Sequence, residues 1–449
     1  MDSAVYAIDT EINKKTNAVL NILIVAAGIT IQTQVLFFKY FFLAAAVMLV
    51  CLSAFILFRQ KCVLPFIRKN LLFLIFVTYV VVLVTVKKIL SFGNPASPSV
   101  LSGYGEIVSF MFGVLLTSVY SRKKVIIFFA SYTVSFAVLF LFTGFDTLYD
   151  FGNICRTVGA FLNPNVLAQY ATASMFFSLI LFNYGKSSLR SVFLVTASVS
   201  CAAAVNSASR SIFLGIIFAA AAALIVFLVY LLLKKNNFPR ISAKGAASAA
   251  LFLLLSVLFV FVYIPKPENA VIDYMSGQEG EDKEADTNIF RGIFSEDEDQ
   301  KPVQNDRRWG IWKGYLGRIE EYFLFGNEDS GTEVLYLENM GREFAPHNML
   351  ISCLFRYGIF GLILFTAVLL KIACTVLKLG RADLLNMLLF MCYCGMLLYG
   401  LLHEITKISV FWPAALCFLN YSKLSDDNSG LVLNSNKSIG GADAGKLPN

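Results

Sequence analysis

The chain has 449 residues, of which 57% are hydrophobic and only 15% are charged; its formal net charge is +7 and its mean hydropathy is +0.69. A soluble globular protein of this length does not need so much apolar surface, so the composition argues against a soluble enzyme and favours an all-α, polytopic membrane protein. The nine cysteines fall mostly inside apolar runs, which argues against a disulfide scaffold.

The apolar runs predict about 12 transmembrane helices, since a bilayer core takes roughly 20 apolar residues per helix. The first run is followed at once by further spans, so it is predicted to be a transmembrane helix rather than a cleaved signal peptide. The predicted spans are 17–34, 41–58, 70–86, 104–120, 124–144, 165–183, 191–207, 210–233, 246–264, 348–370, 383–402 and 407–421.

Basic residues fix the predicted orientation, because cytoplasmic loops carry the excess of lysine and arginine. They cluster on every second connection, which places both termini in the cytoplasm and agrees with an even number of spans. The clusters are Lys14-Lys15, Arg59/Lys61/Arg68/Lys69, Arg122/Lys123/Lys124, Lys186/Arg190, Lys234/Lys235/Arg240/Lys244 and Lys378/Arg381.

The predicted spans divide the chain into four parts. Residues 1–264 form a nine-helix membrane region, and residues 265–346 form a large extracytoplasmic loop. Residues 347–421 hold three more spans, and residues 422–449 are expected to be a disordered cytoplasmic tail. The loop carries 19 of the 30 acidic residues and 9 of the 37 basic ones, a net charge of −10.

The second half of this loop has a helical pattern of apolar residues. Trp309, Trp312, Tyr315, Ile319 and Phe323 recur at helical spacing. The pattern predicts an amphipathic helix that starts near residue 306 and lies on the outer membrane surface, with its tryptophans at the interface.

A small set of ionisable residues faces outward at predicted span ends: Arg156, Arg210, Arg307, Arg308, His347 and the pair His403/Glu404. Each has an ordinary structural explanation, such as a snorkelling arginine or a histidine bound to a backbone carbonyl. Two outward arginines and one histidine of this set, all at helix starts on one face, suit an enzyme that acts on a lipid-linked pyrophosphate. A guanidinium binds phosphate oxygens bidentately, and an imidazole can take a proton from a sugar hydroxyl at neutral pH. There is no HExxH motif and no Walker loop, so neither a metal ion nor another cofactor is expected.

His347-Asn348, followed after nine residues by Gly358-Ile359-Phe360-Gly361, resembles the H-N-x9-G-x-x-G signature of the O-antigen ligase and O-antigen polymerase family. Three further segments resemble parts of the same family: GAFLNPNVLAQY (159–170), SASRSIFLG (207–215) and RWGIW (308–312). The resemblance covers about residues 150–375.

The resemblance implies a GT-C-like membrane glycosyltransferase that needs no metal. Such enzymes transfer a glycan from an undecaprenyl-pyrophosphate carrier to an acceptor hydroxyl, on the outer face of the cytoplasmic membrane. Carried over to matching positions, Arg210 and Arg308 would hold the donor pyrophosphate, and His347 would be a general base or would orient the acceptor. Supporting roles would fall to Asn348, Arg156 and Asn165.

The two glycines of the motif are expected to be structural. Gly358 and Gly361 lie one turn apart on the predicted span, so they would let a neighbouring helix approach closely. Arg356 projects to the face opposite His347 and is expected to be paired or snorkelling.

The acceptor is left open by the motif, because a ligase and a polymerase share it. The implied partners are the lipid-linked donor, a glycan or lipid acceptor and the bilayer, and could include a chain-length regulator or a flippase; no nucleic acid is expected. The rival hypothesis is a transporter or flippase of lipid-linked saccharides, which twelve spans also fit. The large one-sided loop favours the enzyme.

Overall fold

The computed structural model describes residues 14–32, 36–59, 61–90, 104–120, 122–149, 155–161, 163–184, 187–209, 221, 224–225, 228, 243–266, 270–273, 303–327, 335–337, 342–378, 393–401 and 411–417.

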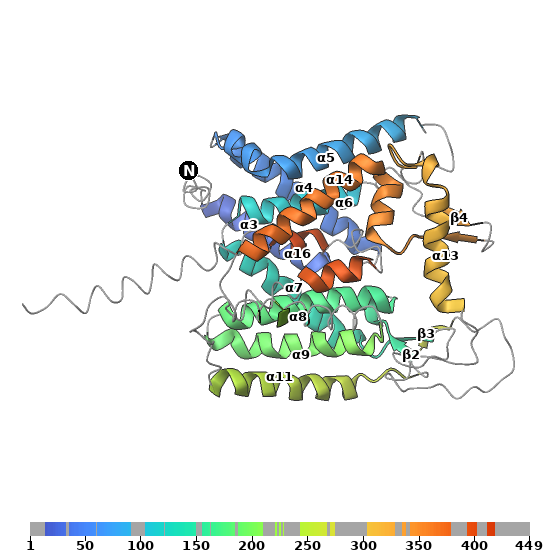
Figure 1. Cartoon of the computed structure of the whole chain (residues 1–449). Helices are drawn as coiled ribbons and strands as arrows, with labels where there is room; N and C mark the ends of the chain where they lie inside the picture. Colours follow the sequence, from blue (N-terminus) through green and yellow to red (C-terminus); the bar gives the residue numbers. More distant parts are fainter. Residues whose placement is uncertain are drawn as a thin grey trace, which may run out of the picture.

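Long apolar helices form a bundle, and α13 with strands β2, β3 and β4 lies at one end of it (Figure 1). The bundle helices are α3 (Lys14–Thr30), α4 (Leu36–Arg59), α5 (Val63–Leu90), α6 (Tyr104–Ser118), α7 (Arg122–Thr143), α8 (Pro164–Tyr184), α9 (Arg190–Asn206), α11 (Ala243–Val262), α14 (Met349–Lys378) and α16 (Phe411–Cys417). Large aromatic side chains fill the core between them, such as Trp412 against Phe110, whose ring centroids are 4.6 Å apart.

The prediction of an all-α membrane protein is confirmed. Five helices are long and apolar enough to cross a membrane: Phe41–Arg59, Val63–Lys87, Lys123–Thr143, Pro164–Phe182 and Met349–Thr375. Four shorter apolar helices are Thr16–Thr30, Glu106–Ser118, Arg190–Asn206 and Ala247–Val262. These helices coincide with nine of the twelve predicted spans. The span 210–233, most of 383–402 and the ends of 407–421 lie largely outside the described residues, so the total of twelve and the positions of the termini stay predictions.

One boundary differs from the sequence prediction for a visible reason. The third span was expected from residue 70, but α5 begins at Val63 and is kinked at Asn70 (φ −108°, ψ 18°). The Asn70 amide donates to the Phe66 carbonyl at 3.0 Å and accepts from Ser118 at 2.8 Å. The kink is therefore stabilised by a buried polar side chain that also contacts the end of α6.

Short strands occur beside the helix ends, where no strand was predicted. β1 (Thr147–Tyr149) pairs antiparallel with β2 (Cys155–Thr157) and parallel with β3 (Ala270–Asp273). β4 (Leu335–Leu337) pairs antiparallel with β5 (Arg342–Phe344). Runs of three or four residues are too short to show the alternation that reveals a strand in sequence.

The amphipathic pattern of the large loop corresponds to α13 (Val303–Gly317), which ends before the predicted pattern does. A 3-10 turn, η4 (Ile319–Glu321), follows it. Ile311 and Tyr315 are buried against Leu354 and Phe355 of α14. One face of α13 therefore packs on the protein, whereas Trp309 on another face is 53% exposed.

α14 is interrupted at Gly358 (φ 68°, ψ −172°), so the prediction of a continuous helix through this glycine is wrong. A Cβ atom at Gly358 would lie 2.2 Å from the Leu324 carbonyl oxygen, and one at Gly326 would lie 2.4 Å from the Arg356 carbonyl oxygen. Gly358 thus admits the backbone of the segment 322–327 rather than a neighbouring helix. Gly361 is closer to its expected role, because its Cβ would lie 3.3 Å from the ring of Tyr79 on α5.

The interruption leaves backbone groups of α14 without helical partners, and other elements satisfy them. α5 and the segment 322–327 supply donors to the three consecutive carbonyls of residues 355–357. The segment 322–327 also supplies a carbonyl that accepts from the second half of α14. These bonds are Asn327 N to Phe355 O (2.7 Å), Lys87 Nζ to Arg356 O (3.1 Å), Tyr79 Oη to Tyr357 O (2.7 Å) and Ile359 N to Phe323 O (2.7 Å). Lys87 Nζ also donates to Asn327 O at 2.6 Å. The break therefore joins α5, α14 and the end of the α13 segment.

We expect Gly358→Ala and Gly326→Ala each to lower the thermal unfolding midpoint of the detergent-solubilised protein. Both residues have positive φ and both would place a Cβ inside another backbone, and the conformational strain alone costs about 1–3 kcal/mol. Gly317→Ala is the matched control, because nothing lies within 4 Å of its Cβ position. An unchanged midpoint for both buried variants would contradict the close docking of 322–327 on α14.

Candidate functional site

The start of α8 carries the first predicted site residue at the end of the bundle where α13 lies. The sequence Asn163-Pro164-Asn165 is a strong helix start, since asparagine is a preferred N-cap and proline suits the first helical position. The Asn163 side-chain oxygen accepts from the backbone N–H of Asn165 (2.9 Å) and of Val166 (3.3 Å). Asn165 therefore has a fixed place in the first turn of α8.

Asn165 joins two other elements. Its side-chain oxygen accepts from Ser209 Oγ at 2.9 Å, and its backbone carbonyl accepts from Tyr399 Oη at 3.2 Å. Ser209 follows α9, and Tyr399 lies in the helical segment 393–401. The start of α8 thus holds the turn after α9 and a helix from the C-terminal part of the chain.

The turn after α9 has an unusual backbone. Ala208 has φ +46° and is fully buried, although it carries a Cβ. Before it, the buried Asn206 amide donates to the carbonyls of Val260 (3.2 Å) and Tyr263 (2.7 Å) at the end of α11. Arg210 follows Ser209 directly in the sequence and lies outside the described residues.

His347 directly precedes the helix that carries the Gly358 break. It is partly exposed and has φ +47°. Asn348 caps α14: its side-chain oxygen accepts from the backbone N–H groups of Leu350 (2.9 Å) and Ile351 (3.2 Å). Its amide nitrogen donates to the Leu401 carbonyl at 3.0 Å. The support predicted for Asn348 therefore takes the form of a helix cap and a bond to the segment 393–401.

A tryptophan connects α13 to the residue before His347. Trp312 Nε1 donates to the Pro346 carbonyl oxygen at 2.9 Å. Position 308 is one helical turn before Trp312 on α13, and residues four apart share a helix face. The backbone of Arg308 thus belongs to the helix that contacts the chain next to His347.

Arg156 lies in β2, opposite Leu148 of β1, and its side chain is partly exposed. β2 contacts α9, the helix that leads to Ser209. Arg156, one of the predicted supporting residues, therefore lies on a strand that contacts α9.

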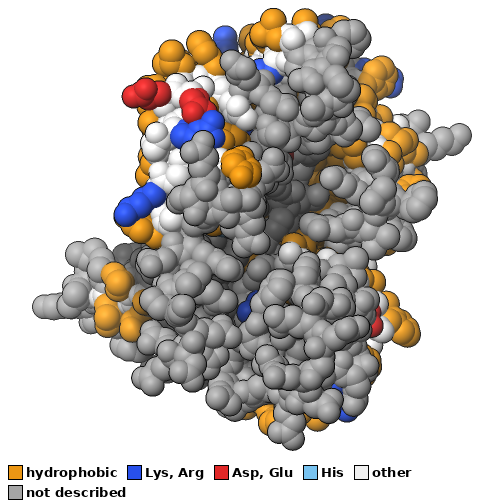
Figure 2. Space-filling view, turned by 90° about the vertical axis from the view of Figure 1, so that its right-hand side faces the viewer, with side chains coloured by type: hydrophobic (Ala, Val, Ile, Leu, Met, Phe, Trp, Pro, Cys, Tyr) orange, Lys and Arg blue, Asp and Glu red, His pale blue; other side chains and the backbone are white. Residues whose placement is uncertain are grey.

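These contacts converge on the segment 393–401, which binds Asn165 through Tyr399 and Asn348 through Leu401. α8 and α14 both begin here, and helix N-termini favour anions. Figure 2 looks onto this end of the molecule. The arrangement can bind an anionic group beside a partly exposed imidazole.

Two of the three non-glycine residues with positive φ in the described ranges, Ala208 and His347, adjoin this cluster. Such backbone strain gathers at functional sites, because surrounding contacts must enforce it. The strain is thus consistent with a binding or catalytic site at this end of the bundle.

Comparison with protein families found a match at residues 192–366 to the family described as O-antigen ligase. This match to residues 192–366 supports the resemblance to the O-antigen ligase and polymerase family. The match includes the α9 turn, α13, His347 and the break in α14, but α8 precedes it. No curated protein matches the chain. Together with the apolar helices, the match points to a multi-pass membrane protein of a glycosyl-transferring family, for which a lipid-linked glycan is the implied donor.

A second polar cluster lies deeper along α14. Arg356 Nη2 contacts Glu106 Oε2 at 2.6 Å, and Tyr357 Oη donates to the same oxygen at 3.0 Å. The two charged side chains are 7% and 11% exposed. Arg356 is therefore paired, as expected, and removing one partner of such a buried pair typically costs about 3–5 kcal/mol.

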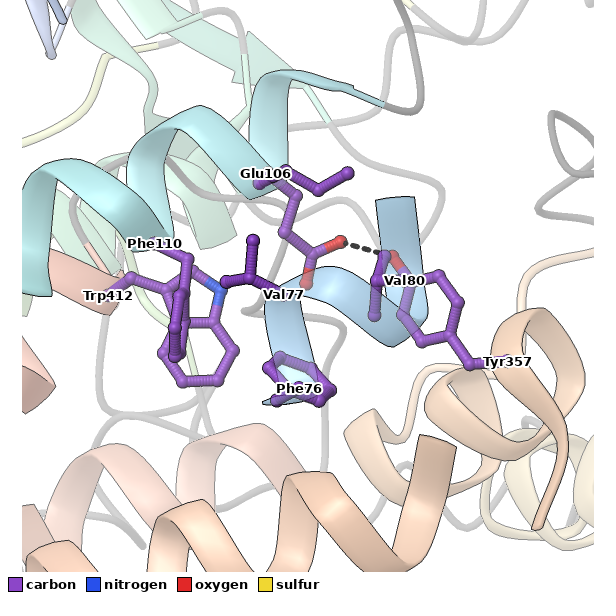
Figure 3. A pocket seen from close by; sticks show the side chains of 8 residues that line it. Phe76, Val77, Val80, Glu106, Phe110, Tyr357 and Trp412 are labelled. Carbon is purple, nitrogen blue, oxygen red and sulfur yellow. Dashed lines mark hydrogen bonds between the residues drawn. The ribbon is translucent and has the colours of Figure 1, made fainter. Parts of the chain in front are cut away.

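Glu106 and Tyr357 border a small pocket, with Trp412 and Phe110 at its other end (Figure 3). The remaining lining is apolar: Phe76, Val77, Val80 and Ile107. Arg356, Tyr357 and Glu106 bind one another, so this cluster fastens α6 to α14.

Two titratable groups next to α13, a carboxyl and a phenol, have shifted pKa values. Hydrogen bonding from Arg318 lowers the pKa of Glu321, and both side chains are about half exposed, so the pair adds little stability. Burial raises the pKa of Tyr322, whose hydroxyl donates to the Tyr315 carbonyl. Both residues belong to the turn that follows α13.

Sequence reasoning missed the residues that hold the site together. Tyr399 and Pro346 gave no signal, because a tyrosine in an apolar run and a proline before a helix are ordinary. Glu106 did carry a signal, since an acidic residue in one apolar run and Arg356 in another predict a buried pair. Among the described residues, no group of three His, Cys, Asp or Glu side chains could hold a metal ion.

Proposed function

We propose that the protein transfers a glycan from an undecaprenyl-pyrophosphate carrier to an acceptor hydroxyl, on the outer face of the cytoplasmic membrane and without a metal ion. The basic clusters on alternate connections support the outward orientation of the α13 end. The family match supports the reaction class. The product would belong to a surface polysaccharide such as lipopolysaccharide, capsule or exopolysaccharide.

The observation that carries this proposal is the convergence on the segment 393–401. Asn165 and Asn348 bind it directly. Ser209, next to Arg210, binds Asn165, and Trp312, one turn from Arg308, binds the residue before His347. Elements far apart in sequence thereby bring Asn165, Ser209 and Asn348 together, and Trp312 contacts the residue before His347.

Arg210 and Arg308 are proposed to hold the donor pyrophosphate. A guanidinium stays charged at any working pH and binds phosphate oxygens in pairs. The N-termini of α8 and α14 add positive potential at the same end. Clamping the leaving group stabilises the charge that develops on it as the bond to the sugar breaks.

His347 is proposed to act as general base toward the acceptor. The acceptor hydroxyl oxygen forms a bond to the anomeric carbon, and the bond from that carbon to the pyrophosphate oxygen breaks. The hydroxyl proton moves to the imidazole, and undecaprenyl pyrophosphate leaves with the bonding electrons. Asn348 would support His347 through the helix cap, and Arg156 and Asn165 would support the mouth of the site.

The acceptor separates two forms of this function. A ligase passes the glycan to a lipid anchor such as lipid A core, and a polymerase passes it to another lipid-linked repeat unit. Both use a hydroxyl acceptor, so the same base and clamp serve either. A transporter of lipid-linked saccharides is the alternative from another class, and the family match weighs against it.

We expect Arg210→Lys and Arg308→Lys each to lose most glycan transfer although the charge is kept, because lysine cannot make the bidentate contact. The measurement is transfer from a lipid-linked donor by purified protein in detergent. Arg318→Lys is the control, because Arg318 pairs with Glu321 on the exposed surface. Parental rates in both clamp variants would show that these arginines do not hold the donor.

We expect His347→Ala to lower transfer by roughly 10²–10⁴-fold, the usual contribution of general acid–base catalysis, while donor binding survives. His403→Ala is the matched control, since the chain has only two histidines. Transfer at a near-parental rate by His347→Ala would refute the general base, and loss of donor binding would instead move His347 into the pyrophosphate clamp.

A further inference from the structure

The backbone of His347 is held in an unfavourable conformation from both sides. A residue with a side chain at φ +47° is in the left-handed region that favours glycine. On its C-terminal side, Asn348 is fixed by the cap of α14 and by its bond to Leu401. On its N-terminal side, the Pro346 carbonyl accepts from Trp312 Nε1 at 2.9 Å.

Trp312 can act as a fixed point because α13 is fastened to α14 at several places. Ile311 and Tyr315 pack on Leu354 and Phe355, and the ring centroids of Tyr315 and Phe355 are 5.1 Å apart. The segment 322–327, which follows α13, docks on the Gly358 break through the bonds described above. α13 and the first half of α14 therefore form one unit that carries both position 308 and His347.

We propose that Trp312 is a positioning residue for His347. Its indole N–H fixes the Pro346 carbonyl and with it the orientation of the next peptide unit, so that the imidazole faces the acceptor. This inference rests on the proposed function, in which His347 is the general base. Because Arg308 and Trp312 lie on the same helix, the bond from Trp312 to Pro346 also fixes the backbone of Arg308 relative to that of His347.

The direct test is Trp312→Phe, which keeps an aromatic ring and removes only the N–H donor. We expect kcat to fall about threefold to tenfold, the equivalent of one hydrogen bond, with the donor KM nearly unchanged. Trp309→Phe is the matched control on the same helix, because its ring is 53% exposed. It should transfer glycan at the parental rate.

A spectroscopic readout separates positioning from a general loss of structure. With only two histidines in the chain, protein labelled with ¹³C-histidine gives two ring signals, which His347→Ala and His403→Ala assign. Trp312→Phe should shift or broaden the signal of His347 and leave that of His403 in place. Trp309→Phe should change neither.

The outcomes distinguish this inference from the proposed function. If His347→Ala is inactive but Trp312→Phe keeps the parental kcat and an unchanged His347 signal, the positioning role is wrong and the general base stands. If both histidine signals change in Trp312→Phe, the tryptophan supports the fold generally and the positioning role is wrong. If His347→Ala stays active, the general base and the positioning role both fall.

Discussion

The end of the bundle that carries α13 depends on the break in α14 at Gly358. A helix interrupted within an apolar span exposes carbonyl and N–H groups that the lipid cannot satisfy, at several kcal/mol for each group. Here Asn327, Lys87 and Tyr79 supply the donors, and the lysine adds positive charge where the first half-helix ends. Satisfying the break therefore requires that the segment after α13 dock on α14.

That requirement explains how a large acidic loop can contribute a basic residue to a site. A loop of net charge −10 would, if it were only solvated, keep its arginines paired with its own carboxylates. Docking on α14 instead fixes α13 beside Pro346, where Trp312 binds. The buried pair of Arg356 and Glu106 then fastens the first half of α14 to α6. The helix that follows His347 is therefore anchored inside the bundle.

The sequence predicted the features that are local in the chain. Hydropathy located nine helices of the described part, and asparagine before an apolar run is a natural cap, as Asn348 and Asn163 both show. The break was not predictable in this way, because a glycine within an apolar run is also typical of helix packing. The break is stabilised by contacts with Lys87, which is 269 residues away from Arg356, and with the backbone at Gly326. Tyr399 and Leu401 likewise act only through contacts that distant segments create.

A structure of the His347→Ala protein with a lipid-linked glycan donor bound would test the central claim most directly. The account predicts that the pyrophosphate lies between the turn after Ser209 and the N-terminal half of α13, with the anomeric carbon facing position 347. A pyrophosphate bound at the opposite end of the bundle, or out of reach of both Arg210 and Arg308, would contradict it.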